Sequence, residues 1–356
     1  MTAPPRSDRP LVVRTEHLDA GAETWLAERC VVRAIGVDDP AFAEVADRVE
    51  ALIVRTYTIV DEVLLDRLPS LRVVARAGVG LDNIDVPACR GRGVEVVYTP
   101  DANTQAVVEY VTCLVCDALR PRVLLDGAVD MARWREIRDE VCGAWQMNEL
   151  VLGILGFGRI GRRVAEVARA IGFTTIFHDL REIPEHDRRG ADAVSMDTLL
   201  AESDVLTIHV DGRDANRGLI DHGMLARLKS DAIVINTSRG FVIDETALAA
   251  WLRDNPAALA ILDVHATEPF TDADPLLGLP NAHLAPHLAS RTTTAMANMS
   301  WVVKDVWQVL QGDPPRHPAP APGPPVHGQA GCSPAPSVMG QSIFERVGRG
   351  VAPLPG

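Results

Sequence analysis

The chain has 356 residues, of which 47% are hydrophobic and 23% are charged, an ordinary balance for a globular protein with room for two domains. Its net charge is −13 and no stretch is rich in lysine and arginine, which argues against nucleic acid as a partner. No apolar run reaches the ~18 residues of a membrane span, and the N-terminus lacks the apolar core of a signal peptide. We therefore expect a cytoplasmic protein with no membrane partner.

The N-terminal part alternates short apolar runs with helical patterns. The runs that indicate strands are Leu11–Arg14, Ala51–Arg55, Val73–Ala75 and Val94–Tyr98. Helical patterns lie between them at Ala41–Val49 and Val60–Leu68. This alternation is typical of βαβ units, so it predicts a parallel sheet.

A long helical pattern follows, from Thr104 to about Ala118, and it contains a C-x-x-C spacing at Cys113 and Cys116. Such a pair can bind a metal or take part in redox chemistry, but this one lies in an apolar run without a second pair. We interpret the two cysteines as small buried residues of a helix. We expect no metal site in the chain.

A glycine-rich unit lies in the middle of the chain. It consists of a strand at Val151–Leu155, a G-x-G-x-x-G turn at Gly156, Gly158 and Gly161, a helix from Arg162 to Gly172, a strand at Thr174–Phe177, and an acid, Asp179. The first glycine of such a turn permits a tight bend, the second lets the backbone approach a pyrophosphate, and the third allows close packing of helix and strand. The helix N-terminus offers unpaired N–H groups to phosphates. The unit therefore predicts a dinucleotide site.

Asp179 bears on the choice between two dinucleotides. It lies where a carboxylate accepts hydrogen bonds from the adenosine ribose, and it would repel a 2′-phosphate. The sequence therefore favours NAD over NADP.

The alternation resumes after this unit. Strands are predicted at Val205–Val210, Ile233–Asn236, Leu259–Val264 and Ala282–Ala285, and helices at 197–200 and 244–252. Three polar segments lie at or near strand ends: NTSRG at 236–240, DVHATEP at 263–269 and PHLA at 286–289. Ligands of open α/β sheets bind at the carboxyl ends of strands, so these segments should lie near the cofactor.

Each of these segments holds one side chain suited to chemistry on an acid. Arg239 offers a planar fork of donors for a carboxylate, and His287 can carry a proton near neutral pH. Glu268, if paired with His287, would hold its imidazole in place. Each residue alone can also be structural, as a loop residue or a surface ion pair. Their joint occurrence downstream of a dinucleotide site favours a catalytic role.

The C-terminal part begins with a helical pattern at Thr292–Leu310, which we expect to pack back on the first domain. Nine prolines then fall between Pro314 and Pro336, with few apolar residues. This composition indicates a disordered tail. The tail is either a simple flexible end or a segment that binds a partner.

In their order and in their residues these motifs resemble those of the D-isomer-specific 2-hydroxyacid dehydrogenases, from roughly Leu11 to Leu310. A further motif of that family is present as RAGVGLDNID at 76–85. The resemblance implies an α/β fold with two domains: a Rossmann-type doubly wound parallel sheet for NAD at 104–290, and a smaller flavodoxin-like substrate domain at 1–103, completed by 291–312. Residues 313–356 would form the Pro-rich tail. Relatives are commonly dimers, so a homodimer is expected.

The resemblance also implies roles for individual residues. Arg239, Glu268 and His287 would be catalytic in hydride transfer between NADH and a 2-oxo acid, which gives a D-2-hydroxy acid. The amides of Gly78, Val79 and Gly80 would bind the substrate carboxylate. The cofactor would be bound by Val107, Gly156, Gly158, Arg159, Ile160, Gly161, Asp179, His209, Val210, Thr237, Ser238 and Asp263.

Two branches of the family leave the substrate and the role open. Arg55 and Arg76 are similar to the pair with which phosphoglycerate dehydrogenases bind a phosphate, which favours a 2-oxo acid with a second anionic group: phosphate, phosphonate or carboxylate. Structural ion pairs are the other interpretation of these arginines. The segment DVHATEPF at 263–270 and the Pro-rich tail resemble the C-terminal-binding-protein branch. The alternative function is therefore an NADH-responsive interaction protein with little or no turnover.

Overall fold

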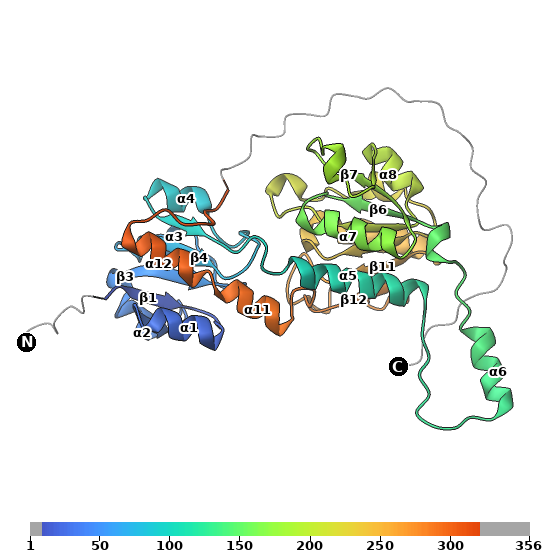
Figure 1. Cartoon of the computed structure of the whole chain (residues 1–356), viewed down its shortest axis with the longest axis horizontal. Coiled ribbons are helices and arrows are strands. Elements are labelled where there is room, and N and C mark those ends of the chain that lie inside the picture. Colours follow the sequence, from blue (N-terminus) through green and yellow to red (C-terminus); the bar gives the residue numbers. More distant parts are fainter. Residues whose placement is uncertain (1–8, 321–356) are drawn as a thin grey trace, which may run out of the picture. The chain divides into compact units, whose positions relative to one another are not determined.

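The computed structural model describes residues 9–320, which fold around two parallel β-sheets (Figure 1). The first has five strands in the order β2-β1-β3-β4-β5. Their bounds are β1 Leu11–Arg14, β2 Val31–Ala34, β3 Val49–Val54, β4 Val73–Arg76 and β5 Glu95–Val97. This is the strand order of flavodoxin-like sheets, as predicted.

Helices cover both faces of this sheet because successive side chains of its strands point to opposite sides. Val12 packs with the helices α1 and α12, and its neighbour Val13 packs with α2, α3 and α4. The helices are α1 Ala20–Ala27, α2 Pro40–Ala43, α3 Glu62–Asp66, α4 Val86–Gly91 and α12 Val303–Gln311. Helix α12 is far from the first sheet in sequence, but it lies beside β4 and α1 in the N-terminal part of the fold (Figure 1).

The second sheet has seven strands in the order β12-β11-β10-β9-β6-β7-β8. Their bounds are β6 Val151–Leu155, β7 Thr174–His178, β8 Asp192–Ala193, β9 Val205–Ile208, β10 Ile233–Asn236, β11 Leu259–Leu262 and β12 Ala282–Leu284. From β6 outward the order matches the doubly wound dinucleotide-binding sheet, with β12 as one further strand. The predicted α/β fold with two parallel sheets is therefore confirmed.

Helices also cover both faces of the second sheet. The helices are α5 Thr104–Leu119 and α7 Arg159–Ala170 on one face, and α8 Met196–Glu202, α9 His222–Leu225 and α10 Glu245–Asp254 on the other. Helix α6, Met131–Glu140, buries none of its residues. It therefore contributes no side chain to either core.

Three local predictions were wrong. The expected helix at 41–49 is the short α2 followed by a 3₁₀ turn at Ala46–Arg48, because Val49 already begins β3. The expected single helix at 292–310 is two helices, α11 Thr293–Ser300 and α12, separated at Trp301. Cys113 and Cys116 lie on α5 as expected, but Cys113 is exposed and Cys116 half-buried, so they are not core residues.

The expected disordered tail is ordered over residues 313–320. Ala319 is buried and donates its N–H to Val96 O on β5, and Pro318 forms an antiparallel bridge with Val97. The rest of that tail, 321–356, and residues 1–8 lie outside the described residues. Within residues 9–320, no helix combines the length and the apolar character that a membrane crossing requires.

Candidate active site

The glycine turn after β6 has a backbone that only glycine permits. Gly156 has φ +91°, and a Cβ there would lie 2.7 Å from the carbonyl carbon of His209. A Cβ on Gly161 would lie 2.2 Å from Gly156 O. Gly158 is the N-cap residue of α7, and a Cβ added to it would meet no atom within 4 Å. This cradle fits a pyrophosphate at the start of α7.

Asp179 lies against this turn. Its Oδ2 accepts a 2.8 Å hydrogen bond from Phe157 N, and its Oδ1 accepts bonds from Arg181 N and Nε. Burial raises the pKa of Asp179, but the Arg181 guanidinium and the two amides lower it by more, so the carboxylate is charged. A charged acid at this place is what the sequence predicted, while its arginine partner was not anticipated.

The other residues expected near the cofactor differ in their burial and in the polar groups they offer. Arg159 forms a 2.8 Å ion pair with Asp101, and Ile160 and Val210 are half-buried. Val107 is buried in the apolar cluster under α5 and offers the cofactor no polar group.

The remaining polar residues expected to bind the cofactor follow β9 and β10. Burial lowers the pKa of His209 to about 3, so its ring is neutral, and its Nε2 lies 2.9 Å from Thr207 Oγ1. Ser238 is bound through N and Oγ to Asn236 Oδ1. Thr237 Oγ1 is buried without a hydrogen-bond partner, so it is available to a bound molecule.

Glu268 and His287 are in contact with each other, as expected from the sequence. Glu268 Oε2 lies 2.8 Å from His287 Nδ1, and Glu268 Oε1 accepts a bond from His265 N. Burial raises the pKa of Glu268, but the His287 ring and His265 together lower it by more. The carboxylate therefore orients the ring and leaves its Nε2 for another partner.

Asp263 positions the loop that carries His287. Its side chain is fully buried, and its two oxygens accept hydrogen bonds of 2.7 and 2.8 Å from Leu288 N and Ala289 N. Burial raises its pKa, although these amides and His287 lower it. His287 itself has φ +55°, a conformation that needs such support. The structure thus places Asp263 against the His287 loop.

Arg239 reaches the first sheet. Its Nε donates to Asp82 Oδ2 at 2.7 Å and its Nη1 to Ser238 O at 2.6 Å. A Cβ on Gly80 would lie 1.7 Å from Nη2 of Arg239, so the guanidinium lies directly on the glycine segment expected to bind a carboxylate.

Arg76 lies on the other side of that segment. Its Nε donates to Gly80 O, and a Cβ on Gly78 would lie 2.6 Å from its Nη1; Val79 between the two glycines is half-buried. Burial and the positive charge of Arg239 lower the pKa of Arg76, to about 10. The arginines are therefore close enough to repel each other.

Arg55, at the end of β3, is buried at 8% exposure without a carboxylate partner. Within residues 9–320, the hydrogen-bond partners of its Nη2 are the sulfur atoms of Met296 and Met299, and its Nη1 has none. Burial lowers its pKa, and so does the positive charge of Arg291. A buried guanidinium with free donors is costly unless an anion reaches it.

Two residues of this region were missed at the sequence level. Asp82 binds Arg239, and Glu16 accepts backbone hydrogen bonds from all four residues of Arg55–Thr58. Asp82 lies within the RAGVGLDNID motif, and Glu16 follows the first strand, so position at a strand end was the available signal.

Residues 113–289 match the family model of the D-isomer specific 2-hydroxyacid dehydrogenase, NAD binding domain. An (S)-sulfolactate dehydrogenase of Chromohalobacter salexigens is 37% identical over 300 residues, which cover 83% of this chain and 96% of that protein. A D-3-phosphoglycerate dehydrogenase of Archaeoglobus fulgidus is 31% identical over 320 residues, 89% of this chain; this chain thus spans 58% of that relative's length. The crystal structure of a glyoxylate reductase from Paecilomyes thermophila has a TM-score of 0.76 at 28% identity and covers 88% of this chain and 99% of that one.

Proposed function

Because the chain belongs to the D-isomer specific 2-hydroxyacid dehydrogenase family, we propose that it transfers a hydride between NADH and a 2-oxo acid, which gives a D-2-hydroxy acid. The observation that carries this proposal is the 2.8 Å contact between Glu268 and His287, in a chain whose glycine turn fits a dinucleotide. When bound, NADH supplies the hydride.

The side chains of the site bind the substrate, transfer the proton and stabilise the developing charge. The guanidinium of Arg239 binds the carboxylate of the substrate, beside the amides of Gly78, Val79 and Gly80. His287 gives the proton on Nε2 to the substrate oxygen, since its Nδ1 is held by Glu268. The positive charges of Arg239 and of the protonated ring stabilise the negative charge that develops on that oxygen. In the reverse direction His287 accepts the hydroxyl proton.

We further propose that the favoured 2-oxo acid carries a second anionic group. Arg55 supports this because its Nη1 is buried without a partner, and Arg76 and Arg291 add positive charge close by. The names of two relatives point the same way, since phosphoglycerate and sulfolactate both carry a second anion, whereas the glyoxylate of the third carries none. A phosphate, phosphonate, sulfonate or carboxylate fits this group of arginines.

The test is steady-state oxidation of NADH with a panel of 2-oxo acids. The panel pairs acids with an anionic tail, such as 3-phosphohydroxypyruvate, phosphonopyruvate, sulfopyruvate and oxaloacetate, with glyoxylate and hydroxypyruvate. We expect the anionic tails to give the highest kcat/KM. Arg55→Met should lower this value about 10- to 100-fold for those acids, the cost of a hydrogen bond to a charged group, and leave glyoxylate unchanged. Tight NADH binding without turnover on any acid would favour the interaction role instead.

We also propose that the protein is a cytoplasmic homodimer. The support for self-association is the segment around α6, where large apolar side chains are exposed. Leu124 is 91% exposed, Met131 63% and Trp134 48%. Apolar side chains gathered on one segment are typical of a surface that another chain covers.

A further inference from the structure

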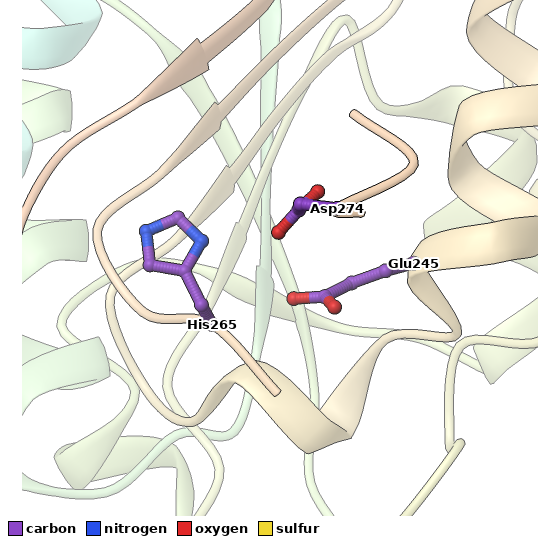
Figure 2. A group of neighbouring side chains, drawn as sticks. All are labelled: Glu245, His265 and Asp274. Carbon is purple, nitrogen blue, oxygen red and sulfur yellow. The ribbon is translucent and has the colours of Figure 1, made fainter. Parts of the chain in front are cut away.

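Three side chains that the proposed reaction does not use converge beside the active-site loop. Glu245 begins α10, His265 follows β11, and Asp274 lies in the loop after the Glu268 segment (Figure 2). One potential ligand atom of each residue lies within 4.8 Å of those of the other two. Glu245 lies on α10, whereas His265 and Asp274 lie nine residues apart in the connection between β11 and β12, so the fold brings the helix and this loop together.

His265 offers a lone pair to this cluster. Its Nε2 lies 2.9 Å from Ala285 O, and a carbonyl oxygen can only accept, so Nε2 carries the proton. In the neutral ring Nδ1 is then an acceptor; it is buried and, within residues 9–320, has no hydrogen-bond partner, in a residue only 6% exposed. Figure 2 shows this edge of the ring turned toward the two carboxylates. A neutral Nδ1 that faces two carboxylates needs a cation or a donor between them, and a proton on Nδ1 is the metal-free solution that the titration below tests.

Each carboxylate keeps one oxygen for such a cation. Glu245 Oε1 accepts a 2.8 Å bond from Ala266 N, and Asp274 Oδ1 accepts a 2.9 Å bond from Leu276 N. The ligand atoms of the two acids lie within 4.8 Å of each other, so two charged carboxylates repel there unless positive charge lies between them.

We propose that Glu245, His265 and Asp274 bind a divalent transition-metal ion of the Zn²⁺ or Mn²⁺ kind. One imidazole nitrogen and two carboxylate oxygens form a ligand set that such ions accept. With metal–ligand bonds of about 2.1 Å, neighbouring ligand atoms lie about 3–4 Å apart, so small side-chain shifts close the site. The bond from His265 Nε2 to Ala285 O is the outer contact that fixes a metal-binding histidine. This proposal departs from the sequence-based expectation of no metal site.

Space and access are also present. Glu245 and Asp274 line a cavity of about 180 Å³, open to solvent, together with Thr267, Phe270 and Thr271. A water molecule occupies about 30 Å³ of liquid, so the cavity accommodates waters as the remaining ligands of the ion. The cavity gives solvent access to the two carboxylates.

The ion would stabilise the loop that carries Glu268. Glu245 binds the loop at Ala266 N, and His265 N donates to Glu268 Oε1 at 3.1 Å. A metal bond at the His265 side chain therefore fixes the backbone that supports the Glu268–His287 pair. The role assigned to the ion is structural, and it does not depend on which acid is the substrate.

The test titrates the full chain, stripped with a chelator, with Co²⁺ and Zn²⁺. The Co²⁺ absorption spectrum reports the ligand type, because thiolate ligands add a charge-transfer band that nitrogen and oxygen ligands lack. This distinguishes the site from Cys113 and Cys116. Asp274→Asn and His265→Gln are the test variants, and both retain a group for the existing backbone hydrogen bond. Asp272→Asn, at an exposed acid of the same loop, is the matched control.

We expect one Co²⁺ per chain without a thiolate band, and a rise in Tm when Zn²⁺ is added. Asp274→Asn and His265→Gln should each weaken binding by about 100-fold and abolish the rise in Tm, since direct ligands matter at least as much as the groups behind them. Asp272→Asn should bind as the unmodified chain does. Absence of stoichiometric binding, a thiolate band, or unchanged affinity in both test variants would overturn the proposal. Circular dichroism of each variant shows that a loss of binding is not a loss of fold.

Discussion

Nε of Arg239 donates a 2.7 Å hydrogen bond to Oδ2 of Asp82, which precedes it by 157 positions in the chain. Ser238 O holds Nη1 of the same guanidinium, so two of its three nitrogens are fixed. The third, Nη2, lies at Gly80. Asp82 is therefore a positioning residue that aims the arginine at the glycine segment.

Asp82→Ala should lower kcat/KM for a 2-oxo acid by about 10- to 100-fold, because a hydrogen bond to a charged group contributes about 1.5–3 kcal/mol. Asp82→Asn retains an oxygen for Nε and should keep most of the activity. Steady-state kinetics measure both, and NADH fluorescence should show unchanged cofactor binding. Equal losses in the two variants would show that the charge of Asp82, rather than its hydrogen bond, matters.

His287→Ala should reduce kcat by about 10²- to 10⁴-fold, the usual contribution of a general acid or base. NADH binding should persist, because the glycine turn and Asp179 are unchanged. His283→Ala is the matched control, since His283 is exposed on β12. Turnover at the unmodified rate in the His287 variant would contradict its assignment as proton donor.

The parts of the fold that the sequence predicted are those set by local chemistry. Gly156 and Gly161 are required by backbone contacts within one βαβ unit, so their spacing is visible in the sequence. The short helix α2 and the break at Trp301 were missed because local propensity hardly separates a short helix from a long one. Tertiary contacts lie at both places: Phe42 of α2 packs on the first sheet, and Ser300 at the end of α11 accepts a hydrogen bond from Asp19 N.

Asp263→Asn should lower kcat by about 100-fold, because an amide nitrogen would face the N–H of Leu288 or Ala289 and displace the His287 loop. The dissociation constant for NADH should change little. The kcat and the NADH affinity, measured separately, distinguish this role from a direct contact with the cofactor. Weaker NADH binding at unchanged kcat would place Asp263 at the cofactor instead.

Glu16→Gln should make stability less dependent on acid pH. Burial raises the pKa of Glu16, but the amides of Arg55–Thr58 lower it by more, so the folded value lies below the ordinary 4.5. A lowered pKa contributes stability above pH 4.5, and the contribution is lost as the pH falls through the folded value.

Urea unfolding of the two proteins across pH 3–7, a range of about four units around that pKa, measures the effect. The Gln variant should be less stable by about 1–2 kcal/mol at neutral pH, and the difference should vanish in acid. Glu44→Gln, at an exposed acid on the same part of the chain, should show no such trend. A difference that is constant with pH would contradict the role of the Glu16 charge.

Contacts between distant residues explain what the sequence could not show. Glu245 lies on α10 and His265 and Asp274 lie in the connection between β11 and β12, and no spacing rule connects the three. His265 belongs to the DVHATEP segment, but its free Nδ1 follows from the position of Ala285 O, which only the folded chain defines. The same holds for the unpartnered Nη1 of Arg55, since the methionines beside it come from α11.

Trp134→Glu should convert the proposed dimer into a monomer. Met131 and Trp134 are three residues apart on α6, so they share one exposed face, and α6 buries nothing against its own chain. A charge on that face would have to be desolvated in an interface, which costs several kcal/mol. Light scattering after gel filtration measures the mass at several concentrations. Ala132→Glu also introduces a negative charge at an exposed position of α6 but on a different face, and it should leave the mass unchanged. A dimer that persists in the Trp134 variant would move the interface away from α6.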